Sequence, residues 1–141
     1  MIEVAGELSS PQADVWALVS EPYHLPDWWP AYRGVRPDRR GVGENARWLV
    51  QRSPSPGFLR KPGGEGVIVI RRVVPGVELG WHDVAQGIDA GVRLEGVGSG
   101  RTKATAYVDG SWWRLRVEGA ARLPRLAISR LHDLCQTAAE L

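Results

Sequence analysis

The stretch 124–141, which reads PRLAISRLHDLCQTAAEL, predicts the element on which the fold depends. Its apolar residues recur at steps of three and four, namely at Ala127, Ile128, Leu131, Leu134, Cys135, Ala138 and Leu141. Polar residues such as Arg125 and Asp133 take the positions between them, so the stretch predicts a long amphipathic helix with one face on a core. The sequence leaves open whether this helix starts at Pro124 or begins near Ser111 and is kinked at the proline.

Seven segments before this helix have the pattern of β-strands. In residues 2–8, apolar residues alternate with Glu3 and Glu7, which is the period of a strand with one covered face. Six further strands are expected at 33–36, 46–52, 66–74, 77–84, 88–97 and 102–109. Pro75-Gly76 and Gly98-Ser99-Gly100 supply tight turns, so neighbouring strands are expected to pair as antiparallel hairpins.

Proline and glycine mark the segments between these strands. Ser10 followed by Pro11 predicts an N-cap and the first position of a short helix that ends near Ser20. Prolines at four-residue spacing make 21–30 a bent connector with at most one helical turn at a time. The stretch 53–66 holds three prolines and four glycines around Phe58, and we interpret it as a mobile flap.

The register of the hairpin at Pro75-Gly76 predicts which side chains face the core. Placing Val74 opposite Val77 sets Ile70 opposite Trp81. The more apolar face then holds Ile68, Ile70, Arg72, Val74, Val77, Leu79, Trp81 and Asp83. By the same parity, the inward residues of the last two strands are Ile88, Ala90, Val92, Leu94, Thr102, Ala104, Ala106 and Val108. The small alanines either interlock with the bulky Trp48 and Trp81 or leave room for a guest, and parity does not separate these alternatives.

Length and composition indicate one ordinary globular domain over residues 1–141. Apolar residues make up 43% of the chain and charged residues 24%, and no window has the roughly 18 uninterrupted apolar residues of a spanning helix. We therefore expect a cytoplasmic protein without integral membrane association. The net charge of +2 comes from positive residues spread along the chain, a pattern that argues against nucleic-acid binding. Cys135 is the single cysteine and has no set of ligand residues beside it, so neither a disulfide nor a metal site nor a cofactor is expected.

Several short motifs resemble those of one known superfamily. Ser9-Ser10-Pro11 followed by Val15-Trp16 resembles its passage from first strand to first helix, and the run from Pro22 to Pro30 with Trp28-Trp29 resembles its second helix. Leu79-Gly80-Trp81, and Val92-Arg93-Leu94 before the glycine turn, resemble its matching strands. Together with the element order, they make the chain similar to the START-like (SRPBCC, polyketide cyclase/dehydrase) superfamily. The likeness covers nearly the whole chain, but the insert at 53–66 is longer than the hairpin usual there.

The resemblance implies an α+β helix-grip fold, in which a seven-stranded curved antiparallel sheet wraps around the C-terminal helix. It also implies a cavity between sheet and helix that holds a hydrophobic small molecule, a class that includes aromatic and polycyclic compounds. Parity and the expected cavity mouth give the candidate ligand-binding residues Trp28, Trp29, Trp48, Ile70, Trp81, Asp83, Val92, Ala104, Ala106 and Trp113. Such families contain carriers and receptors as well as cofactor-free cyclases, so a polyketide cyclase/dehydratase-type enzyme is the alternative, and a protein-interaction domain is a third. A monomer and a homodimer are both compatible with this fold.

Catalytic residues are not evident in the sequence. His24, His82 and His132 fall on different elements, and no Gly-x-Ser-x-Gly elbow is present, so hydrolase chemistry is not expected. Asp83 is the one candidate, because its inward parity would bury a carboxylate, and a buried carboxylate needs a partner. Either Asp83 lies near the rim, where it is solvated or bonded to backbone, or it is a general acid/base with a raised pKa in an apolar pocket.

Overall fold

The computed structural model describes residues 1–53, 64–117 and 119–140. Seven strands form one antiparallel sheet in the order β1-β7-β6-β5-β4-β3-β2. Their bounds are Ile2–Leu8, Tyr32–Arg36, Arg47–Arg52, Glu65–Val74, Glu78–Asp83, Ile88–Gly96 and Thr102–Asp109 for β1 to β7. The expected sheet is confirmed to within one residue at each strand end. The proposed flap falls mostly on residues 54–63, outside the described residues.

The helices follow the expected plan with two differences. Their bounds are Gln12–Val19 (α1), Pro22–His24 (η1), Leu25–Trp28 (α2), Trp112–Val117 (α3), Ala120–Arg122 (η2) and Leu123–Glu140 (α4). α3 and α4 are separate, with Gly119 between them at a φ of 70°, a left-handed conformation that ends helices. The N-cap prediction was wrong by one residue, because Pro11 takes that position and the Ser10 carbonyl instead accepts a bond from the Thr102 hydroxyl at 2.7 Å.

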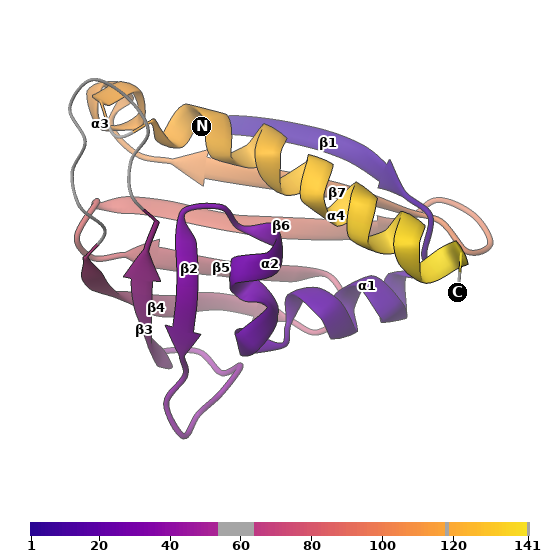
Figure 1. Cartoon of the computed structure of the whole chain (residues 1–141), viewed down its shortest axis with the longest axis horizontal. Helices are drawn as coiled ribbons and strands as arrows, with labels where there is room; N and C mark the ends of the chain where they lie inside the picture. Colours follow the sequence, from indigo (N-terminus) through magenta and orange to yellow (C-terminus); the bar gives the residue numbers. More distant parts are fainter. Residues whose placement is uncertain (54–63, 118, 141) are drawn as a thin grey trace.

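α4 crosses the sheet over β1 and β7, while the connector with α2 lies over the β2 side (Figure 1). The long helix therefore covers only part of the inner sheet face, and the tryptophan-bearing connector covers much of the rest. Helix and sheet approach closely, because a Cβ at Gly6 would lie 2.6 Å from Cγ2 of Ile128. Ala104 pairs with Gly6 in the sheet, so small residues at this end make room for the helix.

We expect Gly6→Ala to lower the free energy of unfolding by about 1 to 3 kcal/mol, the usual cost of overpacking a tight core. Ile128 is β-branched and stiff in a helix, so its methyl group cannot turn away cheaply. Denaturant unfolding would measure the loss, with Ala5→Val on the exposed side of the same strand as a control. If α4 sits as described, adding Ile128→Ala to Gly6→Ala should cost less than the sum of the two single losses.

The predicted hairpin register is right at one end and wrong at the other. Ile70 does pair with Trp81, but the register shifts between Ile70 and Arg72, so that Val74 pairs with Glu78 rather than Val77. A bulge of this kind moves every later side chain to the opposite face. Arg72 consequently points outward and pairs with Glu78 at 3.2 Å, contrary to its predicted inward position.

Candidate functional site

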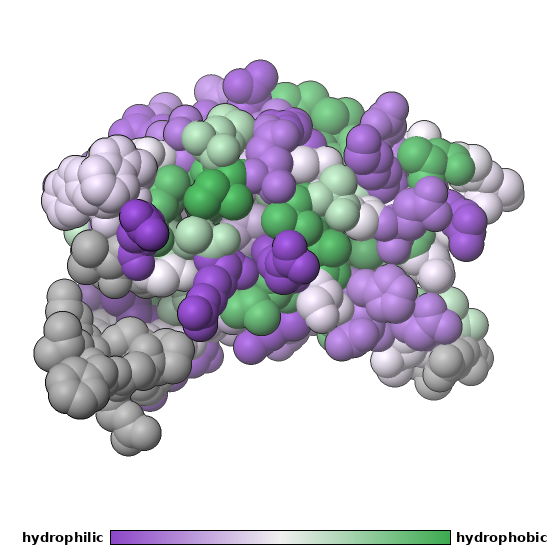
Figure 2. All heavy atoms as spheres, turned by 90° about the horizontal axis from the view of Figure 1, so that it is seen from above, coloured by the Kyte–Doolittle hydropathy of each residue, from purple (hydrophilic) through white to green (hydrophobic). Residues whose placement is uncertain are grey.

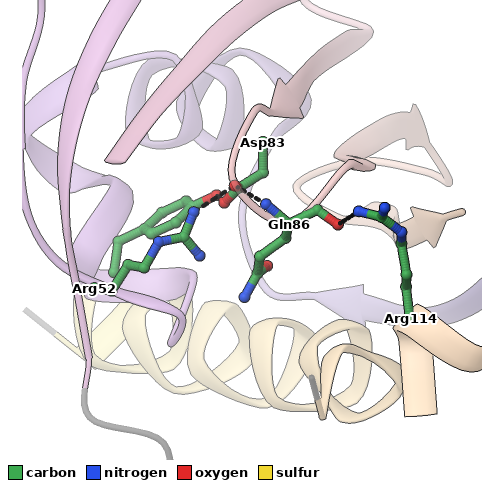
Figure 3. A network of polar contacts seen from close by, with 5 residues as sticks. Arg52, Asp83, Gln86 and Arg114 are labelled. Atoms are coloured by element: carbon green, nitrogen blue, oxygen red, sulfur yellow. Dashed lines mark hydrogen bonds and ion pairs between the residues drawn. The ribbon is translucent and has the colours of Figure 1, made fainter. Parts of the chain in front are cut away.

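Asp83 lies at the centre of a polar network in the otherwise apolar interior (Figure 3). Its carboxylate is 0% exposed and accepts a hydrogen bond from the Tyr32 hydroxyl at 2.7 Å. The Arg52 guanidinium forms an ion pair with Oδ1, and the Gln86 backbone N–H donates to the same oxygen at 3.0 Å. The prediction that Asp83 needs a partner is confirmed, whereas a solvated rim position is excluded.

The network forms where the ends of four neighbouring strands, β2 to β5, lie side by side. Tyr32 opens β2 and pairs with Arg52 at the end of β3, while Asp83 ends β5. β4 lies between β3 and β5, and its Gly66 has no side chain where the guanidinium passes. A Cβ there would lie 3.1 Å from Nε of Arg52. Glycine at this position therefore lets Arg52 reach across one strand to the carboxylate.

The Tyr32 hydroxyl of this network keeps its proton. Burial raises the pKa of Tyr32 well above its usual range, and the charge of Asp83 raises it further. The Trp81 indole and the Arg52 cation act in the opposite direction and do not reverse this. The hydroxyl thus remains a neutral donor at physiological pH. Both Asp83 oxygens already accept bonds from described residues, which leaves the carboxylate poorly placed to act as a general base.

A second layer connects the network to α3. The Gln86 carbonyl accepts a hydrogen bond from Nη1 of Arg114 at 3.0 Å (Figure 3). Gly87 stands beside this contact at a φ of 65°, where any side chain would collide with the guanidinium. Arg114 also lies over the Trp113 ring, 5.0 Å from its centroid. The interior ion pair and the surface of α3 are therefore linked through Gln86.

Three tryptophans pack together beside this network. Trp28, Trp29 and Trp81 are each at most 1% exposed, although they come from the connector and from β5. Their rings meet edge to face, with centroids 5.9 Å apart for Trp28 with either neighbour and 5.1 Å apart for Trp29 and Trp81. The buried N–H of Trp28 finds no hydrogen-bond partner among the described residues. The buried N–H of Trp81 makes no well-formed hydrogen bond with them either, although it lies close enough to the Tyr32 hydroxyl to lower the pKa of that group. Trp48, by contrast, donates to the Gly41 carbonyl at 2.7 Å.

The candidate ligand-binding residues divide into two groups. Nine are buried on the inner side, namely Trp28, Trp29, Trp48, Ile70, Trp81, Asp83, Val92, Ala104 and Ala106. Trp113 is 51% exposed on α3 and, among the described residues, connects to Asp83 through Arg114 and Gln86. A hollow of about 600 Å³ opens over β1, β6 and β7 on the outer face, lined by residues such as Glu3, Arg93 and Lys103. It lies on the opposite side of the sheet from the buried group.

Tyr32 and Arg52 were missed as members of the site. Parity contained a signal for Arg52, since Trp48, Val50 and Arg52 alternate along one strand, and the first two are buried. Arg72 was expected on the inner face instead, and the bulge in β4 turns it outward. Tyr32 had no such signal, because it stands at the junction of connector and strand.

Other polar clusters are local. His24 pairs with Asp27 at 3.0 Å and His82 with Asp89 at 2.9 Å, on two separate surfaces. Within the described ranges, no three His, Cys, Asp or Glu side chains come together as a metal would require. None of the described helices is long and apolar enough to cross a membrane.

Comparisons with known proteins identify the fold. No family model and no curated protein sequence matches this chain. A solved protein from Arthrobacter aurescens matches 96% of this chain with 85% of its own, at a TM-score of 0.73 and 16% identity. The protein NE0264 from Nitrosomonas europaea matches 99% of this chain with 96% of its own, at a TM-score of 0.69 and 18% identity.

A third structure, the di-domain ARO/CYC StfQ from the steffimycin biosynthetic pathway, matches 99% of this chain with 46% of its own. Its TM-score is 0.71 and its identity 11%, so the likeness concerns one half of that protein and the fold alone. Sheet order, short helices after β1 and a long closing helix agree with the fold that the motifs predict. The chain has a helix-grip fold, in which a seven-stranded antiparallel sheet packs against a long C-terminal helix.

Proposed function

We propose that this chain is one ligand-binding domain that holds a flat hydrophobic small molecule between the sheet, the connector and α4. The observation that carries the proposal is the tryptophan cluster, in which the buried Trp28 N–H has no hydrogen-bond partner among the described residues and the buried Trp81 N–H has only a weak contact with the Tyr32 hydroxyl. Buried polar groups are nearly always hydrogen-bonded, and an unpaired one costs about 1 to 3 kcal/mol. A flat ligand carrying an acceptor oxygen would stack on the indoles and accept from these groups, which combines apolar contact with orientation.

The connector is the part that would move to admit such a ligand. The three indoles touch one another, so a guest must separate Trp28 and Trp29 from Trp81. η1 and α2 together span seven residues and contain Pro22 and Pro26, so few backbone hydrogen bonds hold them. The remaining candidate residues, on β3 to β7, would form the fixed wall, and Trp113 the outer margin.

A cyclase or dehydratase remains the second candidate, because fold relatives include ARO/CYC proteins of biosynthetic pathways. The observation in its favour is the buried Tyr32 hydroxyl beside the indoles, which stays protonated but would have to release its hydrogen bond to Asp83 before it could donate to a substrate. We favour binding without catalysis, since the Asp83 oxygens are occupied and no second proton acceptor is described next to them. Tyr32→Phe separates the two candidates, because it removes the hydroxyl and leaves the ring. If the protein is only a binder, the variant should bind the ligand as the wild type does, and neither should convert it. If the protein is an enzyme, the wild type should convert the ligand, and the variant should bind it without converting it.

We expect alizarin, a flat anthraquinone with acceptor oxygens, to quench tryptophan fluorescence and to bind with measurable heat in calorimetry. Trp28→Phe and Trp81→Phe keep an aromatic ring and remove one N–H, so each should weaken binding about fivefold, the worth of one net hydrogen bond. Trp112→Phe, at an exposed indole, is the matched control and should bind as the wild type does. Equal affinity for all variants, or no saturable binding by the wild type, would contradict the proposal.

A further inference from the structure

α3 carries two adjacent tryptophans on the surface, and the ligand site leaves the outer one unused. Trp112 is 71% exposed and Trp113 is 51% exposed. On the face drawn in Figure 2, hydrophobic patches alternate with hydrophilic side chains, as is usual for protein surfaces. Paired exposed indoles are different, since tryptophan is the largest apolar side chain and is buried in most proteins.

The helix that presents these indoles is firmly held. Leu115 is 4% exposed and fixes α3 to the core, and the Leu115 N–H donates to the Ser111 carbonyl at 3.1 Å. Arg114 packs over Trp113 and donates to the Gln86 carbonyl, which ties the helix to the turn after β5. The tryptophans are therefore preorganised, and a partner that covers them need not order the helix first.

The residues that follow the indoles in the sequence are rich in arginine. Between Ser111 and His132 the described residues include no Asp or Glu, and Glu118, outside the described residues, is the only acidic residue of this stretch in the sequence. Arg114, Arg116 and Arg122 lie on α3 and η2. Arg125 and Arg130 lie on α4, where Arg130 donates to the Pro26 carbonyl of the connector. Interfacial indoles combined with arginine are the composition that favours a membrane surface with anionic headgroups.

The position of α3 favours a flat, extended partner. α3 and the start of α4 lie together at one end of the molecule's long axis (Figure 1). Two indoles at the end of the molecule can reach a bilayer interface on their own. A stable protein complex buries about 800 Å² on each partner, which is more surface than two indole side chains offer.

We infer that the Trp112-Trp113 surface of α3 docks on lipid bilayers that carry anionic headgroups. The indoles insert at the headgroup level, and Arg116 and its neighbours attract the negative surface. In this orientation the strand ends that hold Asp83 and Arg52 lie on the side of the molecule nearest the lipid, because Arg114 of α3 bonds to Gln86, and Gln86 bonds to Asp83. The inference does not depend on the proposed small-molecule site, since it rests on surface residues alone.

Vesicle co-sedimentation of the full chain tests this docking. Vesicles of phosphatidylcholine with phosphatidylglycerol should sediment the protein, and phosphatidylcholine alone should do so weakly. Binding should fall as salt rises. Trp112→Ala should reduce the affinity for anionic vesicles about tenfold, because one indole no longer inserts at the interface. The double variant Trp112→Ala with Trp113→Ala should reduce it further. Arg116→Glu should reduce it about tenfold or more, because each charge contributes about fivefold.

Matched controls distinguish docking from general stickiness. Tyr23→Ala removes an aromatic ring that is 65% exposed on η1, and Arg33→Glu reverses an exposed charge on β2, and both should sediment as the wild type does. Trp112→Ala alters only an exposed side chain, so its thermal unfolding should be unchanged. The inference is overturned if Trp112→Ala and Arg116→Glu bind anionic vesicles as tightly as the wild type, or if the wild type does not bind them at low salt. It is equally overturned if the same variants instead abolish self-association or binding to single-stranded nucleic acid.

Discussion

Arg52→Met is expected to lower the free energy of unfolding by about 3 to 5 kcal/mol, the cost of leaving a buried charge without its counter-ion. Asp83 is 0% exposed, and without Arg52 its carboxylate retains only the Tyr32 hydroxyl and the Gln86 N–H among the bonds described. Methionine fills much of the space of the arginine stem, so the loss reports on charge rather than on packing. Denaturant unfolding measures it, and Arg47→Met, at an exposed arginine of the same strand, should change stability by less than about 0.5 kcal/mol.

The double variant Arg52→Met with Asp83→Asn gives the sharper result. Removing both charges leaves no unpaired ion, so the double variant should be more stable than the sum of the two single losses implies. Strictly additive losses would mean that the two side chains do not interact in solution. Asp83→Asn alone leaves the Arg52 guanidinium, which is 17% exposed, without its counter-ion. The substitution therefore lowers stability, so its effect on binding or turnover cannot by itself decide between a binder and an enzyme.

The sheet could be predicted because its strands follow simple alternation over long stretches. Ala104, Ala106 and Val108 are buried, and Thr105 between them is half-buried, as parity predicts. The helix prediction succeeded for a related reason, since the apolar stripe with Ile128 and Leu131 is regular over several turns. Regular periods persist in a sequence only where one face is buried throughout.

The candidate site was less predictable because its residues depend on irregularities. A single bulge next to Arg71 moves Arg72 out of the interior, and no residue type announces it. The Asp83 network further depends on a glycine on β4 that lets Arg52 cross one strand, which is a property of packing between strands. Parity placed Trp81 and Asp83 correctly, but only coordinates reveal that Trp81 meets Trp28 and Trp29.

Stability is also expected to fall steeply above about pH 10, where tyrosine begins to ionise in the unfolded chain. Burial raises the pKa of Tyr32, as described above, and it raises that of Tyr107 on the outer face. The Tyr107 hydroxyl donates to Glu78 at 2.8 Å, and this bond raises its pKa further. At alkaline pH the folded state therefore keeps protons that the unfolded state has lost, so unfolding is increasingly favoured as pH rises.

Each of these tyrosines should contribute a slope of about 1.4 kcal/mol per pH unit between its unfolded and folded pKa values, and none below about pH 9. Unfolding free energies measured by denaturant from pH 8 to 12 would give the slope directly. Tyr32→Phe and Tyr107→Phe should each remove the share of one tyrosine, and the buried Cys135 thiol, whose pKa is also raised by burial, should leave a residual slope in the double variant. Each substitution also lowers stability at pH 8 by removing a buried hydrogen bond. Tyr23→Phe, at the exposed tyrosine, is the matched control and should reproduce the wild-type curve. A wild-type curve that stays flat to pH 12 would show that neither hydroxyl is as buried in solution as described, and it would remove the neutral Tyr32 donor from the site.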